Sequence, residues 1–109
     1  MGITAIKASL KNYLDKLNSQ LPLDGAYLYG SWAEDKATLE SDVDLLILST
    51  HLSKFSEDDR SRLLYRLSVG IPFDLHIYGL TPDEYKNASH LTTIGVVRDS
   101  GNKINLLQQ

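Results

Sequence analysis

Cysteine is absent from the 109-residue sequence, which excludes disulfide bridges, thiolate metal ligands and cysteine nucleophiles. No apolar run approaches the roughly 20 residues that a membrane-spanning helix needs. The first residues also lack the basic segment followed by an apolar segment that is typical of a secretory signal. We therefore expect a soluble, cytoplasmic protein with no membrane partner.

Positive charge is scarce as well. The chain has 11 Lys and Arg residues against 14 Asp and Glu residues, which gives a net charge of −3 with neutral histidines. The densest basic group, Arg60, Arg62 and Arg66, is small, and we interpret it as a solvated helix face. Proteins that bind duplex nucleic acid through charge carry a larger basic patch, so we expect no duplex DNA binding.

Glycine and proline are scattered singly, and the chain has no internal repeat, low-complexity tract or linker. Its length predicts a single domain over residues 1–109. Apolar residues recur at steps of three and four from Ile3 to Leu21, which predicts an amphipathic helix that ends at Pro22. Further helices are predicted from Ser56 to near Gly70, from Thr81 onward, and from Leu91 to Ser100.

Four stretches have the composition of β-strands: Gly25–Tyr29, Asp42–Leu48, Ile71–Tyr78 and Lys103–Leu107. The later part of the second stretch is apolar on both faces, which indicates a strand that is covered on each side. Residues 31–41 are polar and predict a loop or one helical turn. The order of these elements predicts an α/β (α+β) fold, with a small mixed β-sheet flanked by helices.

Gly30 and Ser31 end the first predicted strand. Glycine lets the backbone approach a ligand closely, and serine adds a hydroxyl group. If a short helix begins here, its free backbone N–H groups can hold phosphate oxygens. A helix-capping role for Ser31 is compatible with this interpretation.

Asp42 and Asp44 stand two residues apart at the head of the second predicted strand. The two-residue period of a strand places both carboxylates on one face, about 6.6 Å apart along the backbone. Two ionised carboxylates at about 4 Å repel by about 4 kcal/mol at an effective dielectric constant near 20. Mg²⁺ or Mn²⁺, which prefer oxygen ligands, would relieve this repulsion. The alternative is a solvated strand end without a ligand.

Asp74 is a third candidate, because it lies within an otherwise apolar predicted strand. Strand interiors are depleted of aspartate, and a buried unpaired charge is costly. If the third strand neighbours the second, Asp74 joins Asp42 and Asp44 around two ions about 3.5–4 Å apart, as two-metal phosphoryl transfer requires. The alternative is a structural ion pair with Arg62 or Arg66.

The pattern of Gly-Ser, ten residues, Asp-x-Asp and a later apolar-Asp-apolar strand resembles the polymerase-beta-like nucleotidyltransferase superfamily. It is most similar to the minimal nucleotidyltransferases, often the antitoxin half of HEPN–MNT toxin–antitoxin pairs. This resemblance implies that Gly30 and Ser31 bind the β- and γ-phosphates of a nucleoside triphosphate. It also implies that Asp42 and Asp44 bridge two Mg²⁺ ions, or Mn²⁺ in their place, and that Asp74 binds the ion nearest the acceptor and helps to deprotonate it.

The reaction that the resemblance implies is metal-dependent transfer of a nucleoside monophosphate, AMP from ATP, to a hydroxyl acceptor. The acceptor would be a tyrosine of a HEPN toxin, so the protein would act as an antitoxin with a protein partner. A homo-oligomer is also compatible with the sequence.

One departure from the family pattern leaves an alternative open. Family members commonly have Gly-Ser-x-Ala-Arg-Gly, whereas here Ala33 is followed by Glu34 and Asp35. An acid therefore replaces a basic residue that could contact the triphosphate, and Lys36 is the nearest substitute. The alternative is a catalytically weak antitoxin that masks its partner by contact, or a nucleotide-sensing subunit.

Two further residues have open roles. His76 is predicted on the same strand face as Asp74, where it could contact a metal or a substrate, or be an ordinary strand histidine. Trp32 follows the Gly-Ser pair, and we interpret it as a packing residue, with stacking on a base as the alternative.

Overall fold

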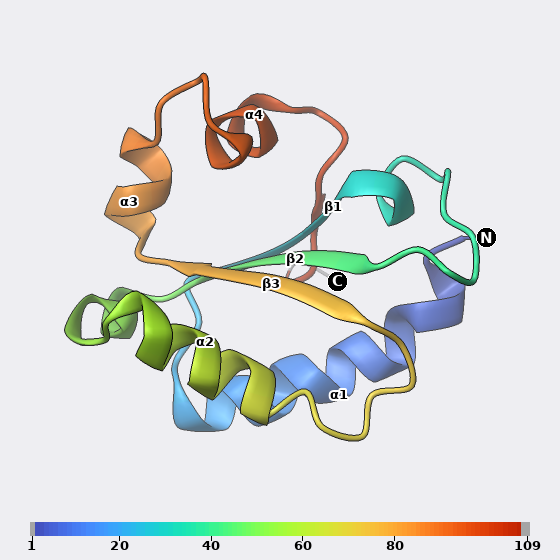
Figure 1. The fold of residues 1–109 in the computed structure, drawn as a ribbon, viewed down its shortest axis with the longest axis horizontal. Helices are drawn as coiled ribbons and strands as arrows, with labels where there is room; N and C mark the ends of the chain where they lie inside the picture. Colours follow the sequence, from blue (N-terminus) through green and yellow to red (C-terminus); the bar gives the residue numbers. More distant parts are fainter. Residues whose placement is uncertain (1, 108–109) are drawn as a thin grey trace.

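A four-stranded mixed sheet organises the chain in the order β3-β2-β1-β4, as the sequence predicts for the fold class (Figure 1). The computed structural model describes residues 2–107. Its elements are α1 Thr4–Gln20, β1 Gly25–Tyr29, the 3₁₀ turn η1 Gly30–Trp32, β2 Val43–Leu48, the 3₁₀ turn η2 Thr50–Lys54, α2 Glu57–Arg66, β3 Leu75–Leu80, α3 Pro82–Asn87, α4 Thr93–Asp99 and β4 Ile104–Asn105. The predicted order of helices and strands is confirmed, and η2 is an element that the sequence did not predict.

The sheet contains both antiparallel and parallel strand pairs. β1 pairs with β2 and with β4 in the antiparallel direction. β2 and β3 pair in parallel, so the chain must cross over between them, and it does so through α2. This parallel pair places the starts of β2 and β3 at the same end of the sheet.

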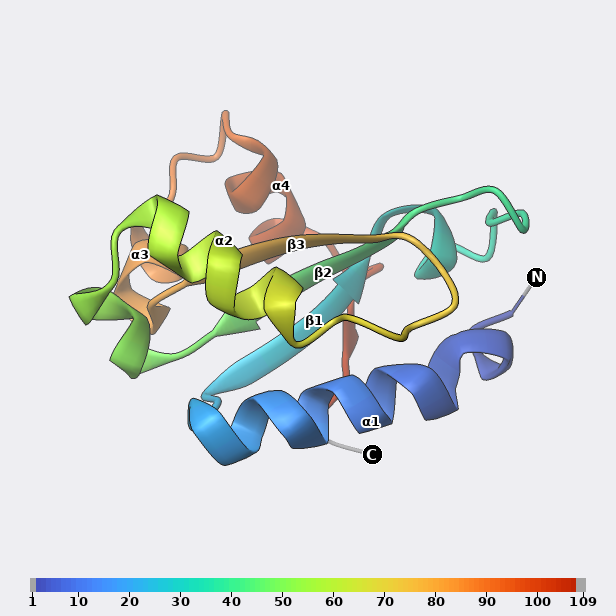
Figure 2. The ribbon, with the colours of Figure 1, turned by 60° about the horizontal axis from the view of Figure 1, so that its bottom comes forward.

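Helices cover both faces of the sheet, with α1 and α2 on one side and α3 and α4 on the other (Figures 1 and 2). Alternate residues of β2 therefore meet different layers. Val43, Leu45 and Ile47 belong to the core that α1 and α2 form, whereas Leu46 and Leu48 pack with Val97 of α4. This double burial confirms that β2 is covered on each side.

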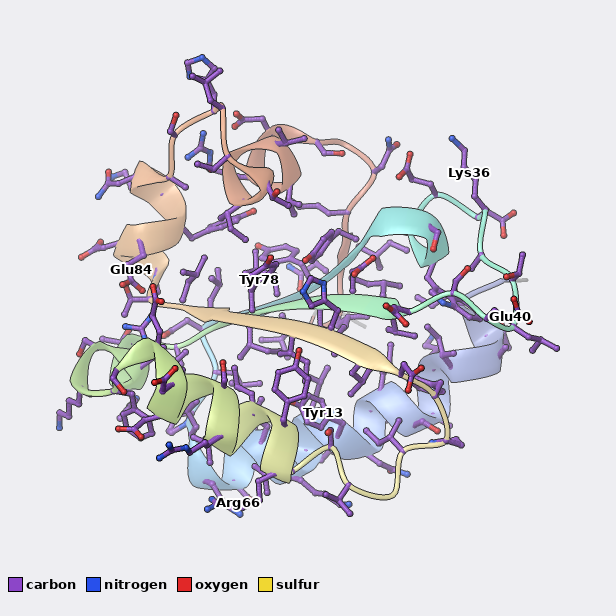
Figure 3. The ribbon with its side chains drawn as sticks, in the orientation of Figure 1. Tyr13, Lys36, Glu40, Arg66, Tyr78 and Glu84 are labelled. Atoms are coloured by element: carbon purple, nitrogen blue, oxygen red, sulfur yellow. The ribbon has the colours of Figure 1, made fainter. Side chains whose placement is uncertain are left out.

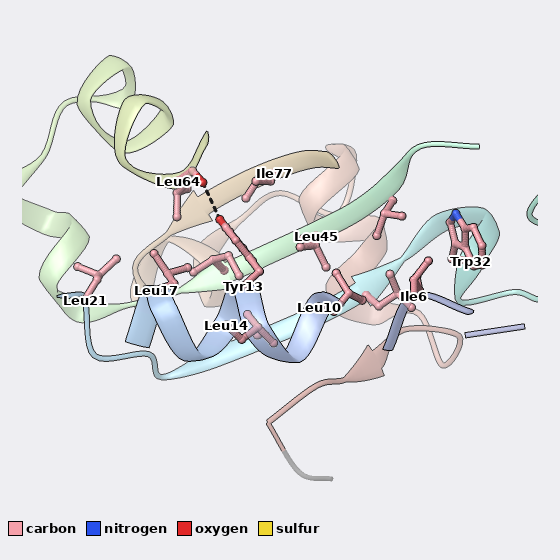
Figure 4. Packing of buried hydrophobic residues seen from close by; sticks show 14 of the residues in the cluster. Ile6, Leu10, Tyr13, Leu14, Leu17, Leu21, Trp32, Leu45, Leu64 and Ile77 are labelled. Carbon is pink, nitrogen blue, oxygen red and sulfur yellow. Dashed lines mark hydrogen bonds between the residues drawn. The ribbon is translucent and has the colours of Figure 1, made fainter. Parts of the chain in front are cut away.

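The larger core lies between α1, α2 and the sheet (Figure 4). Leu10, Leu14 and Leu17 lie along the buried face of α1, at the helical spacing that the sequence shows. Tyr13 is also buried in this layer, and its hydroxyl donates a 2.8 Å hydrogen bond to the carbonyl of Leu64. This bond joins α1 to α2 underneath the sheet.

The third strand begins later than predicted. The sequence predicts it over Ile71–Tyr78, whereas β3 covers Leu75–Leu80. Pro72 lacks a backbone N–H group, and residues 72–73 form a bend. Asp74 therefore lies immediately before β3 and not inside it, which corrects the prediction.

The arginines of α2 were predicted to form a solvated helix face, and this prediction is wrong for Arg60. Arg60 is buried, and it donates hydrogen bonds to the carboxylate of Glu84 and to the carbonyl of Gly79. Arg62 is exposed and pairs with Asp59. Among residues 2–107, no helix is both long enough and apolar enough to cross a membrane.

Candidate functional site

Three polar side chains form a row across β1, β2 and β3 on the face that α4 covers in part. Tyr29 is paired with Asp44, and Asp44 is paired with His76. Residues that are directly opposite in a sheet point to the same face, so this row follows from the register. Tyr78, two residues beyond His76, lies on the same side of the sheet, whereas Tyr13 lies on the other (Figure 3).

Gly30 is in contact with Asp44 at one end of this row. Its φ angle is +73°, in the region that favours glycine. A Cβ atom at this position would lie 2.3 Å from Oδ2 of Asp44, so any other residue would force the carboxylate of Asp44 to move. The sequence prediction that Gly30 permits close approach is consistent with this geometry, although the close neighbour here is the carboxylate itself.

Asp44 is also held by His76. The Nδ1 atom of His76 lies 3.2 Å from Oδ1 of Asp44, and the two side chains are 50% and 24% exposed. Burial raises the pKa of Asp44 above its usual value, and the charge of Asp42 raises it further. The hydrogen bond and charge of His76 act in the opposite direction without cancelling the shift. The contacts of Asp44 therefore do not fully offset the cost of burying its ionised carboxylate.

Asp42 and Asp74 lie beside each other where β2 and β3 begin. The N–H of Val43 donates a 2.9 Å hydrogen bond to the carbonyl of Asp74, so the two chains are already paired there. The register, continued one step back, sets Asp74 opposite Asp42. Both side chains are exposed, and Asp74 makes no ion pair within the described residues, so it is not paired with Arg62 or Arg66.

The donor chemistry at this sheet end fits a hard divalent cation, because carboxylates are the ligands that Mg²⁺ and Mn²⁺ prefer. The side chains do not form a complete metal site: over residues 2–107, no three His, Asp or Glu side chains lie close enough together to hold a metal ion. Asp44 is fixed between Gly30 and His76, whereas Asp42 and Asp74 are exposed. A bound cation would therefore have one carboxylate that is held by its neighbours and two that are exposed to solvent.

Ser31 is the second residue of η1. This short turn agrees with the single helical turn that was one of the two alternatives predicted for residues 31–41. Its carbonyl accepts a hydrogen bond from the N–H of Lys36, which closes the following turn. Trp32 is buried and its indole N–H donates to the carbonyl of Ser41 at 3.3 Å. Trp32 is thus a packing residue, and the stacking alternative finds no support.

Glu34 and Asp35, which depart from the family pattern, take up the turn after η1. Asp35 has a φ angle of +58°, a conformation that a glycine at this position would adopt without strain. The carboxylate of Glu34 lies 3.9 Å from the Nζ atom of Lys36. Lys36 is therefore directed in part toward this acid.

A cleft of about 180 Å³ opens between η1 and the end of α4, next to Gly30. Its walls are formed by Tyr29, Gly30, Glu34, Val96, Val97, Ser100, Asn102 and Lys103. A larger cavity of about 330 Å³ lies between α1 and residues 106–107, on the side of the sheet away from the carboxylates. The smaller cleft is therefore the one that adjoins the candidate site.

Sequence reasoning did not select Tyr29. Its hydroxyl is buried and has no hydrogen-bond partner among the described residues. Burial, the largest cause, and the nearby charge of Asp44 both raise the pKa of Tyr29. The strand period could have placed Tyr29 on the face of the site, but only the register shows that it stands opposite Asp44.

Comparison with known proteins identifies the family to which this chain belongs. The family described as "Nucleotidyltransferase domain" matches residues 10–96 of the chain. The crystal structure of a "putative nucleotidyltransferase" from Sulfolobus solfataricus is similar in fold, with a TM-score of 0.68 and 18% sequence identity over 94% of this chain and 79% of that chain. No curated protein matches the sequence significantly. Since the family match covers most of the chain, including Gly30, Ser31, Asp42, Asp44 and Asp74, the chain belongs to the nucleotidyltransferase domain family.

Proposed function

We propose that this domain is a metal-dependent nucleotidyltransferase that moves a nucleoside monophosphate, AMP from ATP, to a hydroxyl acceptor. The observation that carries the proposal is the contact between Gly30 and Asp44, with Asp42 and Asp74 beside it at the same sheet end. A phosphate-binding turn and a set of carboxylates are the two parts that this chemistry requires.

The proposed roles of the residues are those that the family resemblance implies. The backbone of Gly30 and Ser31 would hold the β- and γ-phosphates at the start of η1. Asp42, Asp44 and Asp74 would hold two Mg²⁺ or Mn²⁺ ions, which when bound neutralise the charge that develops on the phosphates. The oxygen of the acceptor hydroxyl attacks the α-phosphorus and forms a new P–O bond, while the bond to the β-phosphate breaks and pyrophosphate leaves. Asp74 accepts the proton of the hydroxyl group.

A protein acceptor suits the open side of the site. His76 and Tyr78 are 50% and 38% exposed beside the carboxylates, so a large molecule can approach this edge of the sheet. We infer that the acceptor is a tyrosine of a HEPN toxin and that the transfer makes this domain an antitoxin. The family resemblance supports this assignment.

The test is a transfer assay with α-phosphate-labelled ATP, Mg²⁺ and the protein encoded beside this chain. We expect labelled partner with the wild type, and at least about a 100-fold loss with Asp42→Asn or Asp44→Asn, since metal charge stabilisation contributes several kcal/mol. Asp15→Asn is the matched control, because this exposed acid lies on α1, on the opposite face of the sheet. Absence of labelling with either metal, while the partner still binds, contradicts the enzymatic proposal.

Glu34 favours a second candidate function. This acid lines the cleft next to Gly30 and engages Lys36, so it disfavours a triphosphate there. The domain would then act without chemistry, as an antitoxin that masks its partner by contact or as a nucleotide-sensing subunit. The same variants decide between the two functions: unchanged neutralisation of the partner by Asp42→Asn and Asp44→Asn supports masking, whereas lost neutralisation with binding intact supports catalysis.

A further inference from the structure

The two oxygens of the Asp44 carboxylate have different neighbours. Oδ1 lies 3.2 Å from Nδ1 of His76. Oδ2 faces Gly30, close enough that a Cβ there would clash with it. The carboxylate is therefore held on one side by the imidazole and directed on the other side toward the turn at the end of β1.

The imidazole of His76 is itself held in place. His76 is the register partner of Asp44 on the neighbouring parallel strand, so its Cα position is fixed by the ladder. Its ring lies edge-on to the ring of Tyr78, with 4.9 Å between centroids and 60° between planes. The orientation of His76 is thus supported by the strand pairing and by the ring of Tyr78.

An ionised carboxylate can only accept hydrogen bonds, so the imidazole must donate its Nδ1–H group to Oδ1. Carboxylates that bind cations are commonly held in this way by a donor on the oxygen that does not face the ion. Such a donor fixes the angle of the carboxylate and stops it from turning both oxygens to solvent.

We propose that His76 is a positioning residue that fixes Asp44 so that Oδ2 is presented to a cation beside the Gly30–Ser31 turn. This inference rests on the proposed function, because it assigns to Asp44 the role of a metal ligand. His76 acts through Asp44 and touches neither the nucleotide nor the acceptor. It deepens the proposed site by making one of its three carboxylates rigid before the ion arrives.

Three substitutions separate hydrogen bonding from packing. His76→Asn places an amide N–H group near the position of Nδ1, His76→Gln places it near Nε2, and His76→Phe keeps a ring against Tyr78 without a donor. We expect His76→Asn to retain Mn²⁺ affinity close to that of the wild type. His76→Gln and His76→Phe should weaken it roughly 10- to 100-fold, as the loss of such outer partners commonly does.

Mn²⁺ binding is measured by electron paramagnetic resonance, and the ¹⁵N shifts of the His76 ring report its tautomer without any metal. The expected tautomer carries hydrogen on Nδ1. His51→Phe is the control, because His51 is an exposed histidine in η2, at the other end of β2. Its Mn²⁺ affinity should equal that of the wild type.

The outcomes distinguish this inference from the proposed function. A wild-type chain that binds no Mn²⁺, with or without ATP, overturns the proposed function and this role with it. A wild type that binds Mn²⁺ while His76→Phe binds equally well overturns the positioning role alone. An Nε2–H tautomer, or a His76→Asn variant as weak as His76→Phe, also overturns it.

Discussion

The carboxylate of Asp44 occupies the place where a side chain at residue 30 would be. A Cβ atom on Gly30 would stand 2.3 Å from Oδ2, and the antiparallel pairing of β1 with β2 enforces this closeness by setting Tyr29 opposite Asp44. Residue 30 must therefore adopt a positive φ angle and must lack a Cβ atom, and glycine meets both requirements. The proposed binding of one ligand by both the turn and the carboxylate requires that both conditions are met.

Gly30→Ala should therefore lower the free energy of unfolding by about 2–5 kcal/mol. The left-handed backbone costs an alanine about 1–2 kcal/mol, and displacing a packed neighbour costs about 1–3 kcal/mol. Urea unfolding followed by circular dichroism measures the change. Gly70→Ala is the matched control, because Gly70 has a φ angle of +93° with nothing within 4 Å of an added Cβ. Equal losses from the two substitutions would contradict a tight contact between Gly30 and Asp44.

Asp44→Asn should increase stability at pH 7 by about 0.5–1 kcal/mol in metal-free buffer, a common gain when a strained functional group is removed. Burial raises the pKa of Asp44 in the folded chain, so the ionised form destabilises the fold at neutral pH. The penalty disappears as the pH falls through this raised pKa, because the carboxyl group is then protonated. Thermal unfolding with EDTA from pH 7 to pH 3 should show the two curves converging; a gap that widens toward acid contradicts the prediction.

Local patterns predicted the elements that carry the site. The two-residue period predicted that Asp42 and Asp44 share one face. The sequence left open whether the third strand neighbours the second, and the parallel pairing of β2 with β3 meets this condition. Register could not be predicted, because it depends on contacts between residues that are distant in the chain. It sets His76, and not Asp74, opposite Asp44, which is why the histidine was assigned no definite role.

Tertiary contacts also explain the other differences. Arg60 was interpreted as solvated, yet it reaches Glu84, which is far along the chain. β3 includes Gly79, although glycine is a poor strand former. A Cβ atom there would lie 2.6 Å from Leu64 of α2, so the close packing of α2 favours glycine at this position. Neither fact is visible in a local window of sequence.

Glu84→Gln should destabilise the protein by about 1–2 kcal/mol at pH 7, because it leaves the buried guanidinium of Arg60 without its carboxylate. Glu84 is 45% exposed at its side chain, so the lower end of this range is expected. The hydrogen bond from Arg60 lowers the pKa of Glu84. The contribution is therefore present above the unfolded pKa and lost as the pH falls through the folded one, so the stability difference between wild type and variant in urea unfolding should shrink toward zero in acid, below the folded pKa. A difference that persists there contradicts the ion-pair explanation.

Tyr29→Phe and Tyr13→Phe remove the same atom from opposite sides of the sheet and should have opposite effects. The hydroxyl of Tyr29 is buried with no partner among residues 2–107, so its removal should be neutral or stabilising by up to about 1 kcal/mol. The hydroxyl of Tyr13 donates to the carbonyl of Leu64, and its removal leaves that carbonyl unsatisfied at a cost of about 1–3 kcal/mol. Thermal unfolding of both variants measures this contrast. A loss of stability in Tyr29→Phe equal to that in Tyr13→Phe would show that the Tyr29 hydroxyl has a partner in solution, such as a bound water between it and Asp44.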